Sequence, residues 1–124
     1  MNSRTKGAKA EREIANILKG YGYDAHRGVQ YSGLNGDADV VGVDGIHIEC
    51  KRCQQVRDED FLKQAERDAR KGEIPTVWYR RNREEWKVLM RSEAFLLIWG
   101  ELTDEQKAHI SEKLLSVDKI RKKT

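Results

Sequence analysis

The sequence predicts an α/β fold in which a mixed five-stranded sheet is flanked by helices. Apolar residues recur with helical spacing in three segments, and five short extended runs lie between them. Neither repeats nor a Pro/Gly/Ser-rich linker divide the chain, and 124 residues suffice for one modest core. We therefore expect a single domain over residues 1–124, with 1–6 and 119–124 as flexible basic ends.

The elements are expected in the order α-β-β-β-α-β-β-α-α. Five apolar residues with a 3.6-residue period predict the first helix over residues 7–21: Ala10, Ile14, Ile17, Leu18 and Tyr21. An extended segment (23–31), a polar glycine-rich loop (32–36) and a hairpin of two strands (38–43 and 46–51) follow. The second half predicts a helix over 58–71, two strands (76–81 and 86–90) and a short helix after Ser92.

The last predicted helix begins at a capping box formed by Thr103 and Gln106. Its apolar stripe of Ile110, Leu114 and Val117 fits either a core or a dimer interface. The sequence alone does not separate these two roles.

The loop of the hairpin decides which charged side chains share a face of the sheet. A two-residue loop would direct Asp39 away from Glu49. A three-residue loop with Gly45 in the left-handed conformation pairs Val40 with Ile48 and places Asp39 beside Glu49. We expect the three-residue loop, because it sorts charged and apolar residues onto opposite faces.

Asp39, Glu49 and Lys51 are the residues expected to carry chemistry. Carboxylates near a core need a partner or a cation, and hard divalent cations take oxygen ligands. Asp39 and Glu49 are the expected ligands, with the Cys50 carbonyl as a further oxygen. Lys51 can orient a water or stabilise developing charge. The pattern predicts a metal-dependent nuclease, and an exposed strand face with a weak ion pair is the structural alternative.

These three residues reproduce the PD-(D/E)XK nuclease signature, with Ala38 where proline often stands. Over roughly residues 6–90 the sequence resembles the archaeal-type Holliday-junction resolvases and related phage enzymes. The other motifs that carry the resemblance are Lys6-Gly7 followed by Glu11-Arg12, Arg27 before Ser32-Gly33, and Gln64 on the second helix.

The resemblance implies a restriction-endonuclease-like fold and a homodimer that binds branched double-stranded DNA. Such an enzyme resolves a four-way junction by paired nicks that leave 5′-phosphate ends, using Mg²⁺ or Mn²⁺ and no small-molecule cofactor. Glu11 would join the catalytic and metal-binding cluster, although periodicity does not separate it from Glu13. Ser32 is either a loop serine or a contact of the scissile phosphate, and Asp37 is either a second carboxylate or a capping residue.

Basic residues crowd both ends of a chain whose net charge is +3. Such arms either solubilise a protein or contact phosphates. The residues expected on DNA are Arg4, Lys6, Lys9, Arg27, Arg52 and Gln64. His47 shares the charged face, but we expect it to be a packed or solvated histidine rather than a metal ligand.

The single Cys50–Cys53 pair has no second pair at zinc-ligand spacing, which argues against a structural zinc site. No membrane span or signal peptide is expected, so the prediction is a protein of the reducing cytosol, prokaryotic or phage-infected. Two alternatives remain: another repair-type or restriction-type nuclease of the same fold, and a non-catalytic nucleic-acid-binding protein.

Overall fold

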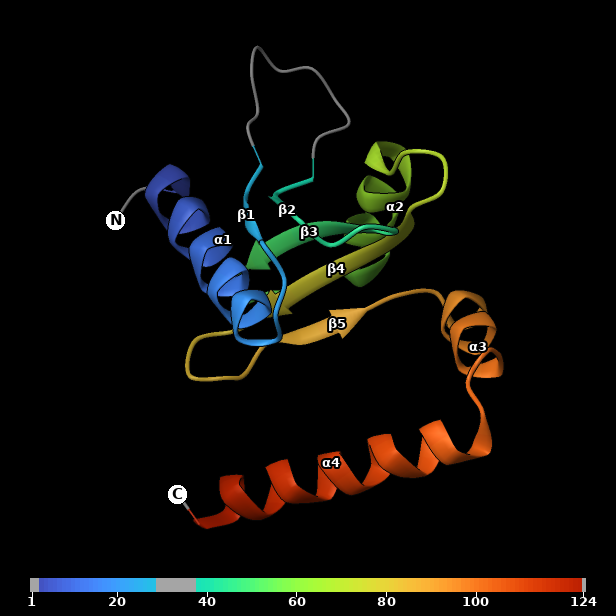
Figure 1. Ribbon diagram of the computed structural model, residues 1–124. Coiled ribbons are helices and arrows are strands. Elements are labelled where there is room, and N and C mark those ends of the chain that lie inside the picture. The colour runs from blue at the N-terminus through green and yellow to red at the C-terminus, as the bar shows by residue number, and fades with distance from the viewer. Residues whose placement is uncertain (1–2, 29–37, 124) are drawn as a thin grey trace. The chain divides into compact units, whose positions relative to one another are not determined.

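The computed structural model describes residues 3–28 and 38–123 (Figure 1). The chain divides into two compact units, Met1–Arg91 and Ser92–Thr124. The elements of the described residues follow the predicted order: α1 (Ser3–Gly20), β1 (His26–Arg27), β2 (Val40–Val41), β3 (Ile46–Arg52), α2 (Asp58–Asp68), β4 (Ile74–Arg80), β5 (Lys87–Leu89), α3 (Ser92–Gly100) and α4 (Asp104–Lys123). The single domain over residues 1–124 and its flexible ends stay predictions.

The five strands form one mixed sheet in the order β1-β2-β3-β4-β5. β3 and β4 are parallel and are connected through α2, whereas the other neighbouring pairs are antiparallel. Val40 pairs with Ile48, and Gly45 has a φ of 89°, which confirms the predicted three-residue loop of the hairpin. The predicted mixed sheet and the predicted register of the hairpin are therefore both confirmed.

α1 packs on β1, β2 and β3 through a core that includes Ile14, Leu18 and Ile48. The helix begins at Ser3, four residues before the predicted start, and Gly20 is its last residue. The predicted stripe is wrong at Ile17 and Tyr21, which are 38% and 77% exposed. Tyr21 follows the end of the helix, so the helical period no longer directs its side chain toward the sheet.

α2 packs on the other face of the sheet through Leu62 and Ala65, which contact Val77 of β4. The next residue of β4, Trp78, packs with the core under α1. Successive residues of a strand point to opposite faces, so α1 and α2 cover opposite faces of the sheet (Figure 1). Trp86 packs against the same core as Trp78.

The second unit consists of α3 and α4. The Thr103 N–H donates to Gln106 Oε1 (2.8 Å) and the Gln106 N–H donates to Thr103 Oγ1 (3.1 Å), which confirms the predicted capping box. Ile110, Leu114 and Val117 are 42%, 59% and 41% exposed, so they form no core within this unit, and their role in a dimer stays a prediction. Across both described stretches, every helix is too short or too polar to cross a membrane.

Gly42 and Gly45 provide a matched test of the hairpin, because both have positive φ angles, 110° and 89°. A Cβ at Gly42 would overlap the carbonyl oxygen of Asp24 and lie 2.7 Å from Ala25 Cα, whereas a Cβ at Gly45 would meet no atom within 4 Å. We expect Gly45→Ala to lower the free energy of unfolding by about 1–2 kcal/mol through backbone conformation alone. Gly42→Ala should cost at least about 1 kcal/mol more in denaturant unfolding. Equal losses would contradict the close approach at Gly42.

Candidate active site

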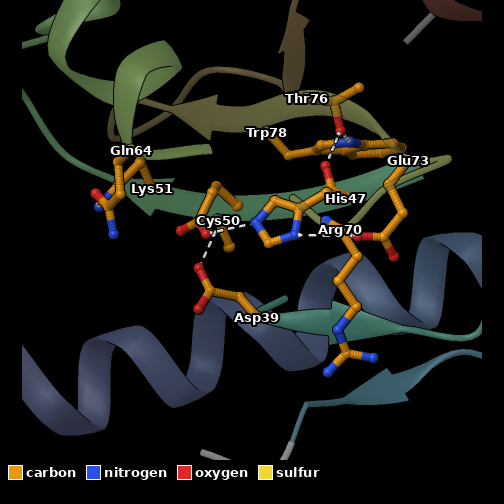
Figure 2. A network of polar contacts seen from close by, with 10 residues as sticks. Asp39, His47, Cys50, Lys51, Gln64, Arg70, Glu73, Thr76 and Trp78 are labelled. Carbon is orange, nitrogen blue, oxygen red and sulfur yellow. Dashed lines mark hydrogen bonds and ion pairs between the residues drawn. The ribbon is translucent and has the colours of Figure 1, made fainter. Parts of the chain in front are cut away.

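The candidate active site lies beside β3, at the point where the chain enters β2. The Asp39 N–H donates to the carbonyl oxygen of Ile48 (3.0 Å), which continues the β2–β3 pairing beyond the end of β2. Asp39 Oδ2 accepts a hydrogen bond of 2.8 Å from the Cys50 N–H (Figure 2). Because Val40 pairs with Ile48, Asp39 lies opposite Glu49. The hairpin thus brings these two carboxyl groups together.

The two carboxyl groups share a partly dry environment. Glu49 is 2% exposed. The pKa of Asp39 is raised to about 7, first by burial and then by repulsion from Glu49, while the hydrogen bond from the Cys50 N–H lowers it. The negative charge of Glu11 also contributes to the raised pKa. Without a cation, the pair is therefore stabilised when one proton is shared or retained.

α1 contributes a third carboxylate, and the structure distinguishes the two candidates on this helix. Glu11 Oε1 accepts a hydrogen bond from Arg27 Nε (3.0 Å), and its charge acts on Asp39. Glu13 instead forms an ion pair with Arg80 Nη2 at 3.2 Å. Glu11 is therefore the α1 carboxylate that this geometry favours. Arg27, predicted to contact DNA, holds Glu11 in place.

Lys51 follows Glu49 by two residues on β3, so both side chains point to the face that α2 covers. Lys51 Nζ donates to Gln64 Oε1 (2.8 Å) and lies 5.3 Å from the centre of the Phe61 ring. Both partners belong to α2, which therefore sets the position of the ammonium group. Figure 2 shows Lys51 and Gln64 side by side at one end of the network.

A pocket of about 550 Å³ opens beside Lys51. Its lining residues come from the start of α1, the end of β3 and α2: Lys6, Gly7, Cys50, Lys51, Arg52, Cys53 and Phe61. Lys6 and Arg52 were predicted to contact DNA, and here they line the same pocket as the predicted catalytic lysine. Arg52 Nη2 donates to Asn82 Oδ1 (2.7 Å), so the guanidinium group is held from the β4–β5 turn.

One more residue predicted to contact DNA has its side chain in the described part of the chain. Lys9 is exposed on α1. Ser32 and Asp37 lie outside the described residues, as does the side chain of Arg4, so their predicted roles stay predictions. The Cys50 main chain reaches Asp39 through its N–H, and the role of its carbonyl oxygen also stays a prediction.

His47 is buried, so of the two alternatives expected, packed or solvated, the packed one holds, but its contact with Glu49 was not predicted from the sequence. His47 Nε2 lies 2.7 Å from Glu49 Oε1, and Nδ1 lies 3.8 Å from Glu73 Oε1. Burial lowers the pKa of His47, but the hydrogen bond and charge of Glu49 outweigh this and raise it above its usual value. The sequence did hold a signal for this contact: His47 and Glu49 are two residues apart on one strand, so their side chains share a face.

The donor set fits a hard divalent cation. Asp39, Glu49 and Glu11 offer carboxylate oxygens, the ligand type that Mg²⁺ and Mn²⁺ take. The repulsion that raises the pKa of Asp39 is the repulsion that a bound cation would remove. Among the described residues, the three candidate ligands whose metal-binding atoms all lie within 4.8 Å of one another are instead His47, Glu49 and Asp68.

A mixed sheet between two helices, with Asp39 and Glu49 paired across a hairpin and Lys51 beside them, defines a nuclease fold of the PD-(D/E)XK class. The model of the phage PDDEXK endonuclease family matches residues 2–124, and the chain belongs to this family. The resemblance to PD-(D/E)XK nucleases of the resolvase type and the predicted fold class are both confirmed.

Among solved structures, the chain is similar to Hjc, a Holliday junction resolvase from the hyperthermophilic archaeon Archaeoglobus fulgidus. The two share 25% sequence identity with a TM-score of 0.53, and the match covers 68% of this chain and 72% of that chain. A comparison with curated proteins finds no match.

The raised pKa of Asp39 predicts how stability depends on pH without metal. Between the ordinary pKa of 3.8 and about 7, the unfolded chain loses a proton that the folded chain keeps. Raising the pH through this range should therefore lower the free energy of unfolding, by on the order of a few kcal/mol. His47, with its raised pKa, adds a loss in the same direction above its ordinary value of 6.5.

Urea unfolding at a series of pH values in EDTA checks this prediction. Asp39→Asn should make the free energy of unfolding depend less on pH between about pH 4 and 7. Asp44→Asn, an exposed aspartate in the same hairpin, is the matched control and should leave the slope unchanged. Stability that rises with pH over this range in the wild-type protein would contradict the assignment.

Proposed function

We propose that this chain is a divalent-metal-dependent endodeoxyribonuclease that resolves four-way DNA junctions. The paired Asp39 and Glu49 carboxyl groups, with Lys51 on the same face of β3, carry the proposal. A short hairpin has no structural need for buried like charges, which are costly without a compensating ion. Membership of a PDDEXK endonuclease family supports the same chemistry.

Asp39, Glu49 and Glu11 would hold the Mg²⁺ or Mn²⁺ ion. When bound, the cation would polarise the scissile phosphoryl group and lower the pKa of the attacking water. Lys51, held by Gln64, would place its ammonium group where negative charge develops on the phosphate oxygens. Cleavage of the bond between phosphorus and O3′ leaves the 5′-phosphate ends that we propose.

The pocket beside Lys51 would receive the DNA backbone. Lys6 and Arg52 line it with Lys51, so three cationic side chains from two elements line one pocket that could receive phosphate groups. Its position next to Glu49 and Lys51 on β3 would bring the scissile phosphodiester to the acidic cluster. Arg4 and Lys9, on the same helix as Lys6, would extend this contact along the backbone.

We further propose that the enzyme acts selectively on four-way junctions. The similar Hjc structure is that of a Holliday junction resolvase, which supports this substrate class. Paired nicks on opposite strands need two active sites in a fixed arrangement, so we propose a two-fold homodimer. We place its work in the reducing cytosol of a prokaryote or a phage-infected host, a setting that suits the two free cysteines found in the described residues.

Cleavage of a four-way junction, a flap and a linear duplex, each with Mg²⁺ or EDTA, tests the proposal. We expect Mg²⁺-dependent nicking that is fastest on the junction. Asp39→Asn should reduce the rate by at least about 100-fold, because it removes a charge that acts on the cation and the phosphate. Asp44→Asn, in the same hairpin, is the control and should cut normally. Equal cleavage of all three DNAs would rule out junction selectivity, and full activity of Asp39→Asn would rule out the site.

Binding to an uncleaved junction in Ca²⁺ should weaken steeply with salt, because phosphate contacts release counterions. We expect a slope equivalent to about 6–10 released ions for a dimer that spans two arms. Lys6→Gln should reduce this slope by about 1, while Lys19→Gln, about 20 Å away at the other end of α1, should not. A flat salt response of the wild-type protein, or a monomer in sedimentation with and without DNA, would count against the proposed complex.

A further inference from the structure

We propose that His47 is a positioning residue, which holds the Glu49 carboxylate in the orientation that binds the divalent cation. This inference rests on the proposed function, because it assigns a role for His47 at the same metal site. His47 does not touch the substrate in this account. It acts through Glu49.

The side chains of His47 and Glu49 are in direct contact. His47 Nε2 lies 2.7 Å from Glu49 Oε1, a distance typical of a strong charge-assisted hydrogen bond. His47 is 0% exposed and Glu49 is 2% exposed. In such a dry site a lost hydrogen bond is not replaced by water, so this contact strongly restricts the Glu49 side chain.

The main chain at His47 is itself held in place by side chains of β4. The hydroxyl group of Thr76 on β4 donates to the His47 carbonyl oxygen (2.8 Å), and Trp78 Nε1 donates to Thr76 Oγ1 (3.1 Å). Figure 2 shows His47 between Asp39 and the Thr76–Trp78 pair. The backbone of β3 at His47 is therefore tied to β4 by side chains as well as by the parallel ladder.

Two further carboxyl groups, those of Glu73 and Asp68, lie near the imidazole ring. Nδ1 makes no hydrogen bond within the described residues, and it lies 3.8 Å from Glu73 Oε1. A carboxylate oxygen of Asp68 lies within 4.8 Å of a ring nitrogen of His47 and of a carboxylate oxygen of Glu49. Within the described residues, the ring therefore makes its one hydrogen bond through Nε2, and the partner is Glu49.

The consequence for metal binding follows from the repulsion between Asp39 and Glu49. Two like charges that share a site push each other apart, and a free glutamate would turn away from Asp39. With Oε1 held by His47, the Glu49 carboxylate is kept beside Asp39 and its second oxygen is left for the cation. Partners of metal ligands that act in this way change metal affinity about 10-fold to 100-fold when removed.

Mn²⁺ binding to the full chain, measured by isothermal titration calorimetry without DNA, tests the role of His47. His47→Leu keeps the bulk of the ring but removes the donor, and should raise the Kd for Mn²⁺ at least about 10-fold. His47→Gln keeps an N–H near the position of Nε2 and should bind within about 3-fold of the wild-type protein. His109→Leu, an exposed histidine on α4, is the control and should bind unchanged. Junction cleavage by His47→Leu should need more Mn²⁺ for half-maximal rate, while the rate at saturating Mn²⁺ changes less than about 5-fold.

An unchanged Kd in a folded His47→Leu variant would overturn the inference. If circular dichroism shows that His47→Leu does not fold, His47→Gln and His47→Asn decide, because asparagine is one carbon too short to reach Glu49. Equal Kd values for these two would then overturn it. A loss of binding in Asp68→Asn equal to that in His47→Leu would identify His47 as a direct ligand and also overturn the positioning role. Wild-type protein that binds Mn²⁺ but cuts no DNA would refute the proposed nuclease while the effect of His47 on the Kd still stands.

Discussion

Repulsion between Asp39 and Glu49 is the constraint around which this nuclease fold is arranged. The register of β2 and β3 places the two carboxyl groups opposite each other in a site where Glu49 is almost completely buried. The neighbouring contacts oppose the repulsion from several sides. The Cys50 N–H donates to Asp39 and His47 contacts Glu49. These contacts let the chain fold with its carboxyl pair in place before any cation or DNA arrives.

The scaffold explains why this pair can exist at a sheet. β2 is only two residues long, and within the described residues it pairs with β3 at Ile48, so Asp39 reaches the main chain of β3 just beyond that pair. A one-residue slip would turn every side chain of the hairpin to the other face, and the positive φ of Gly45 helps to prevent it. α2 then supplies Gln64 to the lysine of the same face. A short strand, a glycine turn and α2 therefore position Asp39, Glu49 and Lys51.

Much of the fold could be predicted from sequence because its signals are local. Helical period, alternation along β3 and the turn at Gly45 predict the element order and the hairpin register. Local signals did not choose between Glu11 and Glu13, since the distinction depends on which side of α1 meets β1 and which meets β4. The bond from His47 to Glu49 was also missed, because strand alternation predicts a shared face but not a contact. The expected burial of Tyr21 was wrong because α1 ends one residue before it, at a turn that contains glycine.

The most direct test of the account is a crystal structure of the protein with Mn²⁺, in which anomalous scattering locates the ion. The account predicts a peak between the Asp39 and Glu49 carboxylates, within ligand distance of both, with His47 Nε2 still bonded to Glu49. An ion bound instead by His47 and Asp68, or Asp39 and Glu49 too far apart to share one ion, would contradict it.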